Sequence, residues 1–100
     1  MKIYISGAVT GTTNHIERFG KAEQELTAEG YSVVNPVKVN AQLPDDTSYD
    51  EYMKMSFCML DMCDAIYMLN GWEESRGANR EYGYAIAKGK EVFFESEEDT

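Results

Sequence analysis

The chain has 100 residues, of which 43% are hydrophobic and 27% are charged, a balance typical of one globular domain. Its net charge of −9 excludes strong binding to polymeric nucleic acid, because that affinity comes mainly from Lys and Arg side chains that neutralise phosphates. No apolar run approaches the roughly 20 residues of a membrane span, and the opening MKIYIS is too short and too alternating for a signal peptide. We therefore expect a cytoplasmic protein without a membrane partner, with one domain over residues 1–95 and an acidic tail over residues 96–100.

The first predicted strand covers residues 2–6, KIYIS, where β-branched and aromatic residues alternate with others. A loop rich in glycine and threonine, GAVTGTTN, follows over residues 7–14. Its Gly7 and Gly11 match neither a dinucleotide-binding fingerprint nor a P-loop, which also needs Lys followed by Ser or Thr. Two explanations remain for these glycines: a turn that needs them, or a ligand that comes close to the backbone.

A helix is predicted next, because Asn14 and Glu17 have the spacing of an N-terminal capping pair. Its apolar face would consist of Ile16, Phe19, Ala22 and Leu26. Gly30 is a typical end signal. His15 stands alone at the start of this helix without a partner at metal-ligand spacing, so we expect neither a metal site nor a cofactor.

A second strand, YSVV, is predicted over residues 31–34 and ends at Asn35-Pro36. The loop that follows is about a dozen residues long, which suits either a functional lid or a mobile connection. The remaining predicted elements are a helix over 49–62, a strand over 64–69, a helix over 76–88 and a strand formed by EVFFE.

Strands that alternate with helices at this spacing predict β-α-β units and a parallel sheet. We expect an α/β fold of the flavodoxin or Rossmann-like type, with four or five strands and helices on both faces. In such a sheet, ligands bind beyond the carboxyl ends of the strands, where the winding direction reverses. The loops 7–14, 35–48 and 70–75 lie at that edge, so the functional site should lie among them.

The helix predicted over residues 49–62 has apolar side chains around an arc of about 200°. They are Tyr52, Met53, Met55, Phe57, Met59, Leu60, Met62 and Cys63. This arc is wider than one-sided packing requires, so the helix either forms a twofold homodimer interface or is buried within the monomer. Cys58 and Cys63 lie five residues apart and face different directions, which makes them poor disulfide partners.

The helix predicted over residues 76–88 begins with the small pair Gly77-Ala78, which leaves room for a ligand to approach the backbone. Its N-terminal amides carry partial positive charge and favour an anion. Ser75 is either only the helix cap or a phosphate ligand. Glu81 lies on the border of the sheet-facing stripe, and no salt bridge four residues on explains it. That stripe is predicted to contain Ala78, Tyr82, Ala85, Ile86 and Gly89.

Two aromatic residues at strand ends are further candidates for the same site. Tyr4 either directs its hydroxyl to the rim of the sheet or packs within its strand. Trp72 either stacks on a nucleobase or anchors its loop. Arg76 and Arg80 add positive charge near the predicted anion site.

The segments IYISGAVTG, VVNP and CDAIYMLNGWEESRGANREYGYAIAKG resemble, over nearly the whole chain, a bacterial and phage family of unknown function. That family is similar in fold to the nucleoside 2-deoxyribosyltransferases and the 2'-deoxynucleoside 5'-monophosphate N-hydrolases. The most specific element is the Ser-x-Gly-x-x-x-Glu string, here Ser75, Gly77 and Glu81. The resemblance implies that Glu81 is a catalytic nucleophile and that Tyr4 orients it.

The implied reaction is an attack of Glu81 on the anomeric carbon of a 2'-deoxyribonucleotide, with loss of the base through an oxocarbenium-like transition state. Water or a second base would then resolve the covalent intermediate, which makes the protein a hydrolase or a glycosyltransferase. The partner would be a small nucleoside or nucleotide. The candidate binding residues are Gly7, Thr10, Gly11, Asn35, Trp72, Ser75, Gly77 and Ala78.

The chain departs from its relatives at several positions. Ser56 replaces an Asp that usually faces the site and is the candidate acid for the leaving base, and Asp61 and Asp64 are predicted to point elsewhere. Thr10 replaces an Arg that binds phosphate. The fifth strand and the C-terminal residues that relatives lend to a neighbouring subunit look absent. A second function therefore stays open: a module that binds a nucleotide without turnover.

Overall fold

The computed structural model describes residues 1–96, and residues 97–100 of the predicted acidic tail lie outside the described part. The strands are β1 (Lys2–Ser6), β2 (Ser32–Val34), β3 (Ala65–Met68) and β4 (Glu91–Phe94). The helices are α1 (His15–Ala28), α2 (Pro36–Asn40), α3 (Tyr49–Asp61) and α4 (Arg76–Ala87), with a short 3-10 turn, η1 (Trp72–Glu74). No helix within residues 1–96 is both long enough and apolar enough to cross a bilayer.

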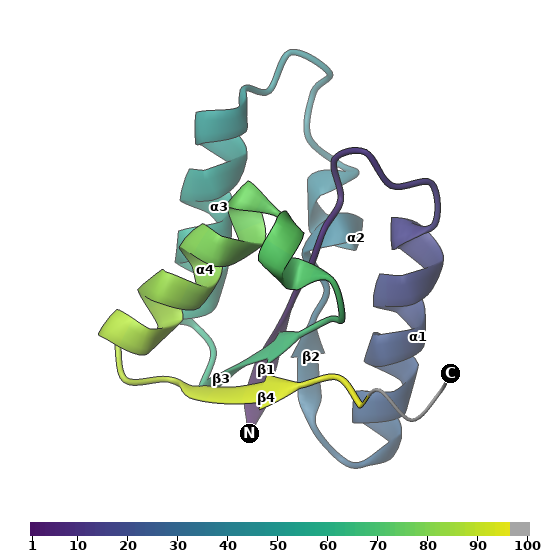
Figure 1. Cartoon of the computed structure of the whole chain (residues 1–100), viewed down its shortest axis with the longest axis vertical. Helices are drawn as coiled ribbons and strands as arrows, with labels where there is room; N and C mark the ends of the chain where they lie inside the picture. Colours follow the sequence, from purple (N-terminus) through teal and green to yellow (C-terminus); the bar gives the residue numbers. More distant parts are fainter. Residues whose placement is uncertain (97–100) are drawn as a thin grey trace.

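The four strands form one parallel sheet in the order β2-β1-β3-β4. Helix α1 lies on one side of the sheet, and α3 and α4 lie on the other (Figure 1). The chain first moves from β1 to β2 and then returns past β1 to β3, so its winding reverses between β1 and β3. This arrangement confirms the predicted flavodoxin-like α/β fold and places the switch point at the carboxyl ends of these two strands.

Alternation along β1 divides the core into two layers. Ile3 and Ile5 point toward α1, where they pack in one cluster with Phe19. Tyr4 packs in a second cluster with Leu60 of α3, and its neighbour on the same strand face is Ser6. A polar residue at the carboxyl end of a central, buried strand therefore faces α3 and α4.

The start of α1 differs from its prediction. Asn14 is the N-cap but forms no capping hydrogen bond through its side chain, because its backbone (φ −122°, ψ 17°) is not in the extended conformation of a capping residue. Ile16 was expected on the apolar face, but it is 68% exposed. It lies in the first turn, beyond the carboxyl ends of the strands, so no sheet lies beneath it.

Helix α2 occupies part of the segment predicted to be a loop. Asn35 caps it by accepting a hydrogen bond from the backbone N–H of Val37 at 3.1 Å, and Pro36 takes the first helical position. An Asn-Pro pair can end a strand and can also start a helix. The sequence analysis predicted only the end of the strand. The rest of the loop ends at the capping box of Ser48 and Glu51, which starts α3.

Much of the wide apolar arc of α3 is used within the chain. Met53, Met59 and Leu60 are buried, and Phe57 stacks on Tyr84 of α4 with ring centroids 4.5 Å apart. Met62, directly after the helix, is 60% exposed. The homodimer through this helix stays a prediction. Fewer apolar side chains of the helix are exposed than its wide apolar arc suggested, so fewer are free to form an interface.

The sheet-facing stripe of α4 is narrower than predicted. Ala78 and Ala85 are fully buried, but Ile86 is 51% exposed because it lies 100° further around the helix than Ala85. The two cysteines are free thiols: Cys58 is exposed and Cys63 is buried.

Candidate active site

Glu81 is a buried carboxylate at the carboxyl end of β1. Only 8% of the residue is exposed, although the sequence placed it on a border. The Tyr4 hydroxyl donates a hydrogen bond to Oε2 at 2.7 Å, and the Ser6 hydroxyl donates one to Oε1 at 2.6 Å. The burial is deeper than expected because α3 packs against α4 and brings Ser56, itself buried, to the carboxylate.

The β1 strand supplies both hydroxyls because Tyr4 and Ser6 lie two residues apart and so share one face. The chain then leaves the sheet through Gly7, where an added Cβ would lie 3.0 Å from two side-chain atoms of Leu69. A glycine at this position therefore allows the end of β1 to pass close to the end of β3, directly beside Glu81.

Burial raises the pKa of Glu81, while hydrogen bonds from Ser6, Tyr4 and Ser56 act in the opposite direction. The pKa of Tyr4 is raised well above its usual value of 10.0, first by burial and then by the nearby charge of Glu81. Tyr4 is therefore a neutral hydrogen-bond donor throughout the physiological range. The hydroxyls of the site stabilise the ionised carboxylate against the cost of burying it.

A cavity of about 450 Å³ opens over Glu81. Its lining contains six of the predicted site residues, namely Gly7, Thr10, Ser75, Gly77, Ala78 and Glu81. Tyr4 lies behind the carboxylate and reaches it by the hydrogen bond described above. The cavity thus lies where the loop after β1, the start of α1, helices α2 and α3, and the first two turns of α4 meet.

Three predicted binding residues do not line this cavity. Asn35 is the cap of α2, and its amide also donates to Glu23 at 3.1 Å. Trp72 packs on Tyr82 with ring centroids 4.8 Å apart, so it anchors the loop before α4. Gly11 has a φ of 82°, so it serves a turn of the first loop.

The first turn of α4 has the open geometry that its small residues suggested. Ser75 accepts a hydrogen bond from the Ala78 backbone N–H at 3.1 Å, which makes it the helix cap. A Cβ added at Gly77 would lie 3.6 Å from the Met53 sulfur, an ordinary contact distance.

The positive charges predicted near the site lie over an aromatic ring. The guanidinium groups of Arg76 and Arg80 lie 5.0 and 5.6 Å from the ring centre of Tyr49. None of the described residues that line the cavity is Lys or Arg.

His15 lines the cavity, although the sequence suggested no role for it. Its Nδ1 atom lies 3.1 Å from the Thr12 hydroxyl, and that hydroxyl donates its own proton to the Val9 carbonyl at 2.8 Å. Nδ1–H must therefore donate to Thr12, and Nε2 is left for another partner. The signal in the sequence was the position of a histidine directly after the glycine-rich loop, at the edge where ligands bind.

Asn40 is a second residue of the lining that the sequence did not indicate. Its Oδ1 atom is the one buried side-chain nitrogen or oxygen within residues 1–96 that has no hydrogen-bond partner. A buried acceptor without a partner costs about 1–3 kcal/mol. Its place at the end of α2, an element that the sequence did not predict, explains why it was missed.

Comparison with known proteins gives a family and a fold. The family described as "Domain of unknown function (DUF4406)" matches residues 1–94. The structure is similar to a 2-deoxyribosyltransferase from Bacillus psychrosaccharolyticus, with 20% sequence identity, a TM-score of 0.76, and coverage of 94% of this chain and 71% of that one.

The structure is also similar to the CMP N-glycosidase BcmB from Clostridium botulinum, with 21% identity, a TM-score of 0.67, and coverage of 94% of this chain and 70% of that one. None of the curated proteins matches the sequence. At these identities, the two solved structures show a shared fold.

Proposed function

The chain belongs to the DUF4406 family, and from this premise we propose that it cleaves the N-glycosidic bond of a 2'-deoxynucleoside or its 5'-monophosphate. The observation that carries the proposal is the Glu81 carboxylate, which is buried beside a cavity with one hydroxyl on each oxygen. The similarity in fold to a deoxyribosyltransferase and a nucleotide glycosidase supports the same chemistry.

In the proposed reaction, a Glu81 oxygen bonds to the anomeric carbon while the bond from that carbon to the base nitrogen breaks. The electron pair of the broken bond leaves with the base, which then needs a proton. Water or a second base attacks the anomeric carbon next and frees Glu81. Tyr4 and Ser6 hold the carboxylate in one orientation, so aligning it adds little to the activation free energy.

The proton for the leaving base requires a donor other than a second carboxylic acid. Glu81 is the only Asp or Glu among the described residues of the lining, and Ser56, which also lines the cavity, offers only a hydroxyl. We assign this role to Nε2 of His15 in the imidazolium form, in which Nδ1–H donates to Thr12 and the second proton, on Nε2, passes to the nitrogen of the leaving base. His15 shares the cavity with Glu81.

An uncharged nucleoside fits the cavity better than its monophosphate. No Lys or Arg side chain is found in the described lining, and Arg76 and Arg80 lie over the ring of Tyr49.

The alternative is a module that binds a nucleoside without cleaving it. The observation that favours it is Ser56, because a hydroxyl beside Glu81 cannot replace a carboxylic acid as proton donor to the base. In that case Glu81 would accept hydrogen bonds from a ligand rather than attack it.

The test incubates the protein with a panel of 2'-deoxynucleosides and their 5'-monophosphates and follows free base by chromatography. The native chain should release base, and Glu81→Gln, which keeps the shape of the side chain, should lower the rate by at least about 10³-fold. Ligands that raise the melting temperature of the native chain without any release of base would instead support the binding module.

A further inference from the structure

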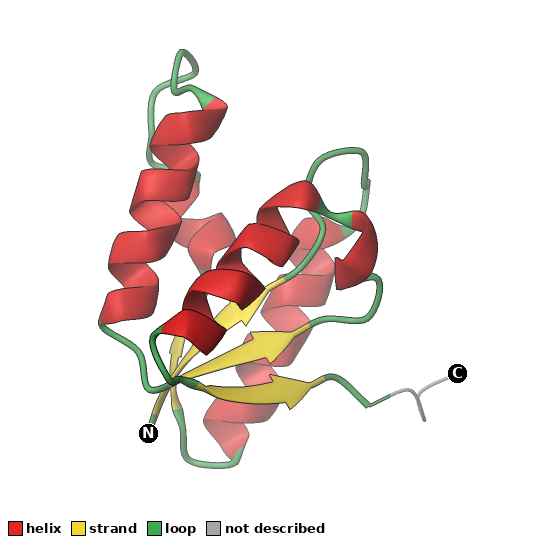
Figure 2. Cartoon of the chain, turned by 60° about the vertical axis from the view of Figure 1, so that its left-hand side comes forward, coloured by secondary structure: helices red, strands yellow, loops and turns green. Residues whose placement is uncertain are grey.

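The sheet face that α1 covers is only half occupied. Neighbouring strands lie about 4.8 Å apart and packed helices about 8–10 Å apart, so one helix covers about two strands. Helix α1 contacts β2 and β1, whereas α4 on the opposite face contacts β3 and β4. Figure 2 shows α4 in front of the sheet and α1 behind it. Helix α2 packs beside α1 but contacts β1 and α3, so no helix within residues 1–96 covers β3 and β4 on the α1 side.

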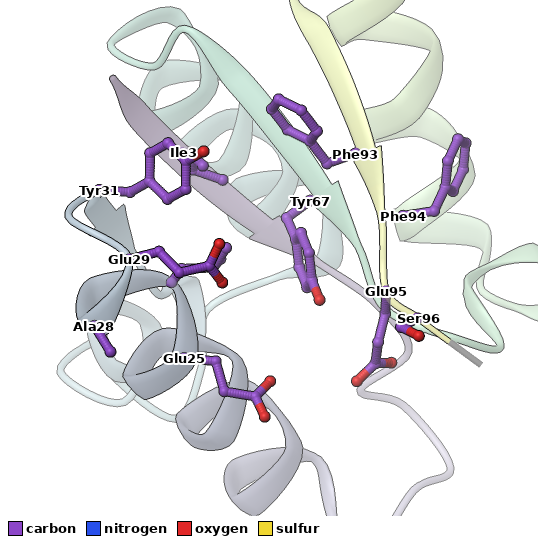
Figure 3. A pocket seen from close by; sticks show the side chains of 11 residues that line it. Ile3, Glu25, Ala28, Glu29, Tyr31, Tyr67, Phe93, Phe94, Glu95 and Ser96 are labelled. Atoms are coloured by element: carbon purple, nitrogen blue, oxygen red, sulfur yellow. The ribbon is translucent and has the colours of Figure 1, made fainter. Parts of the chain in front are cut away.

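A groove of about 580 Å³ marks this uncovered area. Tyr67 of β3 and Phe93 of β4 project into it from neighbouring strands, and both are only partly buried (Figure 3). Tyr31 lies at the opposite wall of the groove, next to the end of α1. The floor is therefore aromatic and as wide as one helix.

The rim of the groove is acidic. Glu25, in the last turn of α1, and Glu29, which caps the C-terminus of that helix, lie four residues apart and line the side of the groove (Figure 3). Glu95 lies at the far end, where it is partly neutralised by Arg18 at 3.6 Å. In the described part of the chain, Glu25 and Glu29 form no ion pair or side-chain hydrogen bond, and the lining contains no Lys or Arg. The local charge therefore comes mainly from these two carboxylates.

We propose that this groove binds a basic amphipathic helix of a partner protein. The apolar stripe of such a helix would cover Tyr67 and Phe93 and complete the half-empty layer, and Lys or Arg beside the stripe would face Glu25 and Glu29. A second copy of this chain is the poorer occupant, because each copy carries a net charge of −9 and the rims of two grooves would repel each other.

The groove and the cavity over Glu81 have no lining residue in common. A partner on the groove can therefore bind while the cavity stays open. It also follows that the test below does not depend on the proposed glycosidic activity, because it measures only binding.

The experiment measures fluorescence anisotropy of three labelled peptides of about 18 residues, or five helical turns. The first has a Leu stripe flanked by Lys and Arg, the second has the same composition in scrambled order, and the third has Glu in place of each basic residue. The native chain should bind the first peptide at least about 10-fold more tightly than the others, and added salt should weaken that binding.

Matched variants locate the binding site. Glu25→Lys with Glu29→Lys should weaken binding of the basic peptide at least about 10-fold, because the rim becomes positive. Asp45→Lys with Asp46→Lys makes the same change of charge in an exposed loop and should leave affinity within about twofold. Phe93→Ser should weaken binding without altering the charge. Circular dichroism confirms that each variant is folded.

Two results would overturn the proposal. The first is no binding of the basic peptide, or binding that both charge-reversed pairs weaken equally, since that reports only a general attraction to an acidic surface. The second is a homodimer in sedimentation experiments that Phe93→Ser dissociates, since the occupant would then be another copy of the chain.

Discussion

At the scale of single residues, the site depends on how one buried carboxylate is held. Glu81 can be singled out from the sequence because no helical neighbour explains its charge. The structure shows that the hydroxyls of Tyr4 and Ser6 donate hydrogen bonds to it. Tyr4 could be anticipated from its place near a strand end. Ser6 and Ser56 could not, because a serine is equally common in a turn, in a cap and beside a buried acceptor, and only tertiary contacts distinguish these cases.

Tyr4→Phe should lower the rate of base release by about 10-fold or more and move the acid side of its pH profile upward. The change removes a hydrogen bond that favours the ionised form, so the pKa of Glu81 rises further. Tyr84→Phe is the control, because it removes a hydroxyl bonded to a carboxylate of Asp61, away from the site. An unchanged pH profile in Tyr4→Phe would contradict the positioning role.

His15→Gln should slow the release of a natural base by about 10²-fold or more. It should have little effect on a 2-deoxyriboside whose leaving group is 4-nitrophenolate, since that anion needs no proton. Equal loss with both substrates would mean that His15 has no acid role. If the native chain cleaves neither substrate, the result contradicts the proposed function itself and does not test the role of His15.

Glu81 should also affect stability in a pH-dependent way. Its pKa in the folded chain is above the usual 4.5, so the folded state keeps a proton that the unfolded chain has already released. Stability is then lost as the pH rises from 4.5 through the raised pKa. Thermal unfolding from pH 4.5 to 8 should show this loss in the native chain and a smaller one in Glu81→Gln. Parallel curves would mean that Glu81 is not destabilised by burial.

At the scale of elements, the first turn of α4 both caps the helix and lines the cavity. Ser75 caps the helix, and the glycine and alanine that follow leave the cavity free at its floor. The sequence predicted α4 well because its cap, periodicity and end signal agree. It missed α2, because five residues after an Asn-Pro pair are too few for any periodicity to appear.

Gly77→Ala should separate stability from ligand binding. Alanine favours a helix over glycine by up to about 1 kcal/mol, and the added methyl meets only ordinary contacts. The melting temperature should hold or rise by a few degrees, whereas the methyl narrows the cavity and should reduce ligand-induced stabilisation. Gly83→Ala is the control in the same helix, because its Cβ would meet nothing within 4 Å. Equal ligand effects in both variants would place the ligand elsewhere.

At the scale of the whole molecule, alternation of strands and helices was enough to predict a parallel α/β sheet. It did not give the strand order, because local pattern does not record which strands become neighbours. The functional edge was nevertheless predictable, since the carboxyl ends of parallel strands lie together in any order. The half-covered face could not be foreseen, because the amphipathic pattern of a strand does not tell which helix covers it.

The predicted homodimer belongs to this scale too. If α3 forms its interface, Met55→Glu with Met62→Glu should turn a dimer into a monomer, because two carboxylates from each copy would be buried at a twofold contact. Sedimentation velocity of the native chain and the variant measures this. A native chain that is monomeric at all concentrations would show that α3 serves only the monomer.

The spacing of Tyr4 and Ser6 has a consequence for how the chain folds. If β1 slipped by one position against its neighbours, Ile3 and Ile5 would take the places of the two hydroxyls, and the charge of Glu81 would be stranded against hydrocarbon. The buried carboxylate thus favours the native register of the central strand. A sheet with β1 in a shifted register would be less stable, and the loss of stability would arise at the site where the chemistry is proposed to take place.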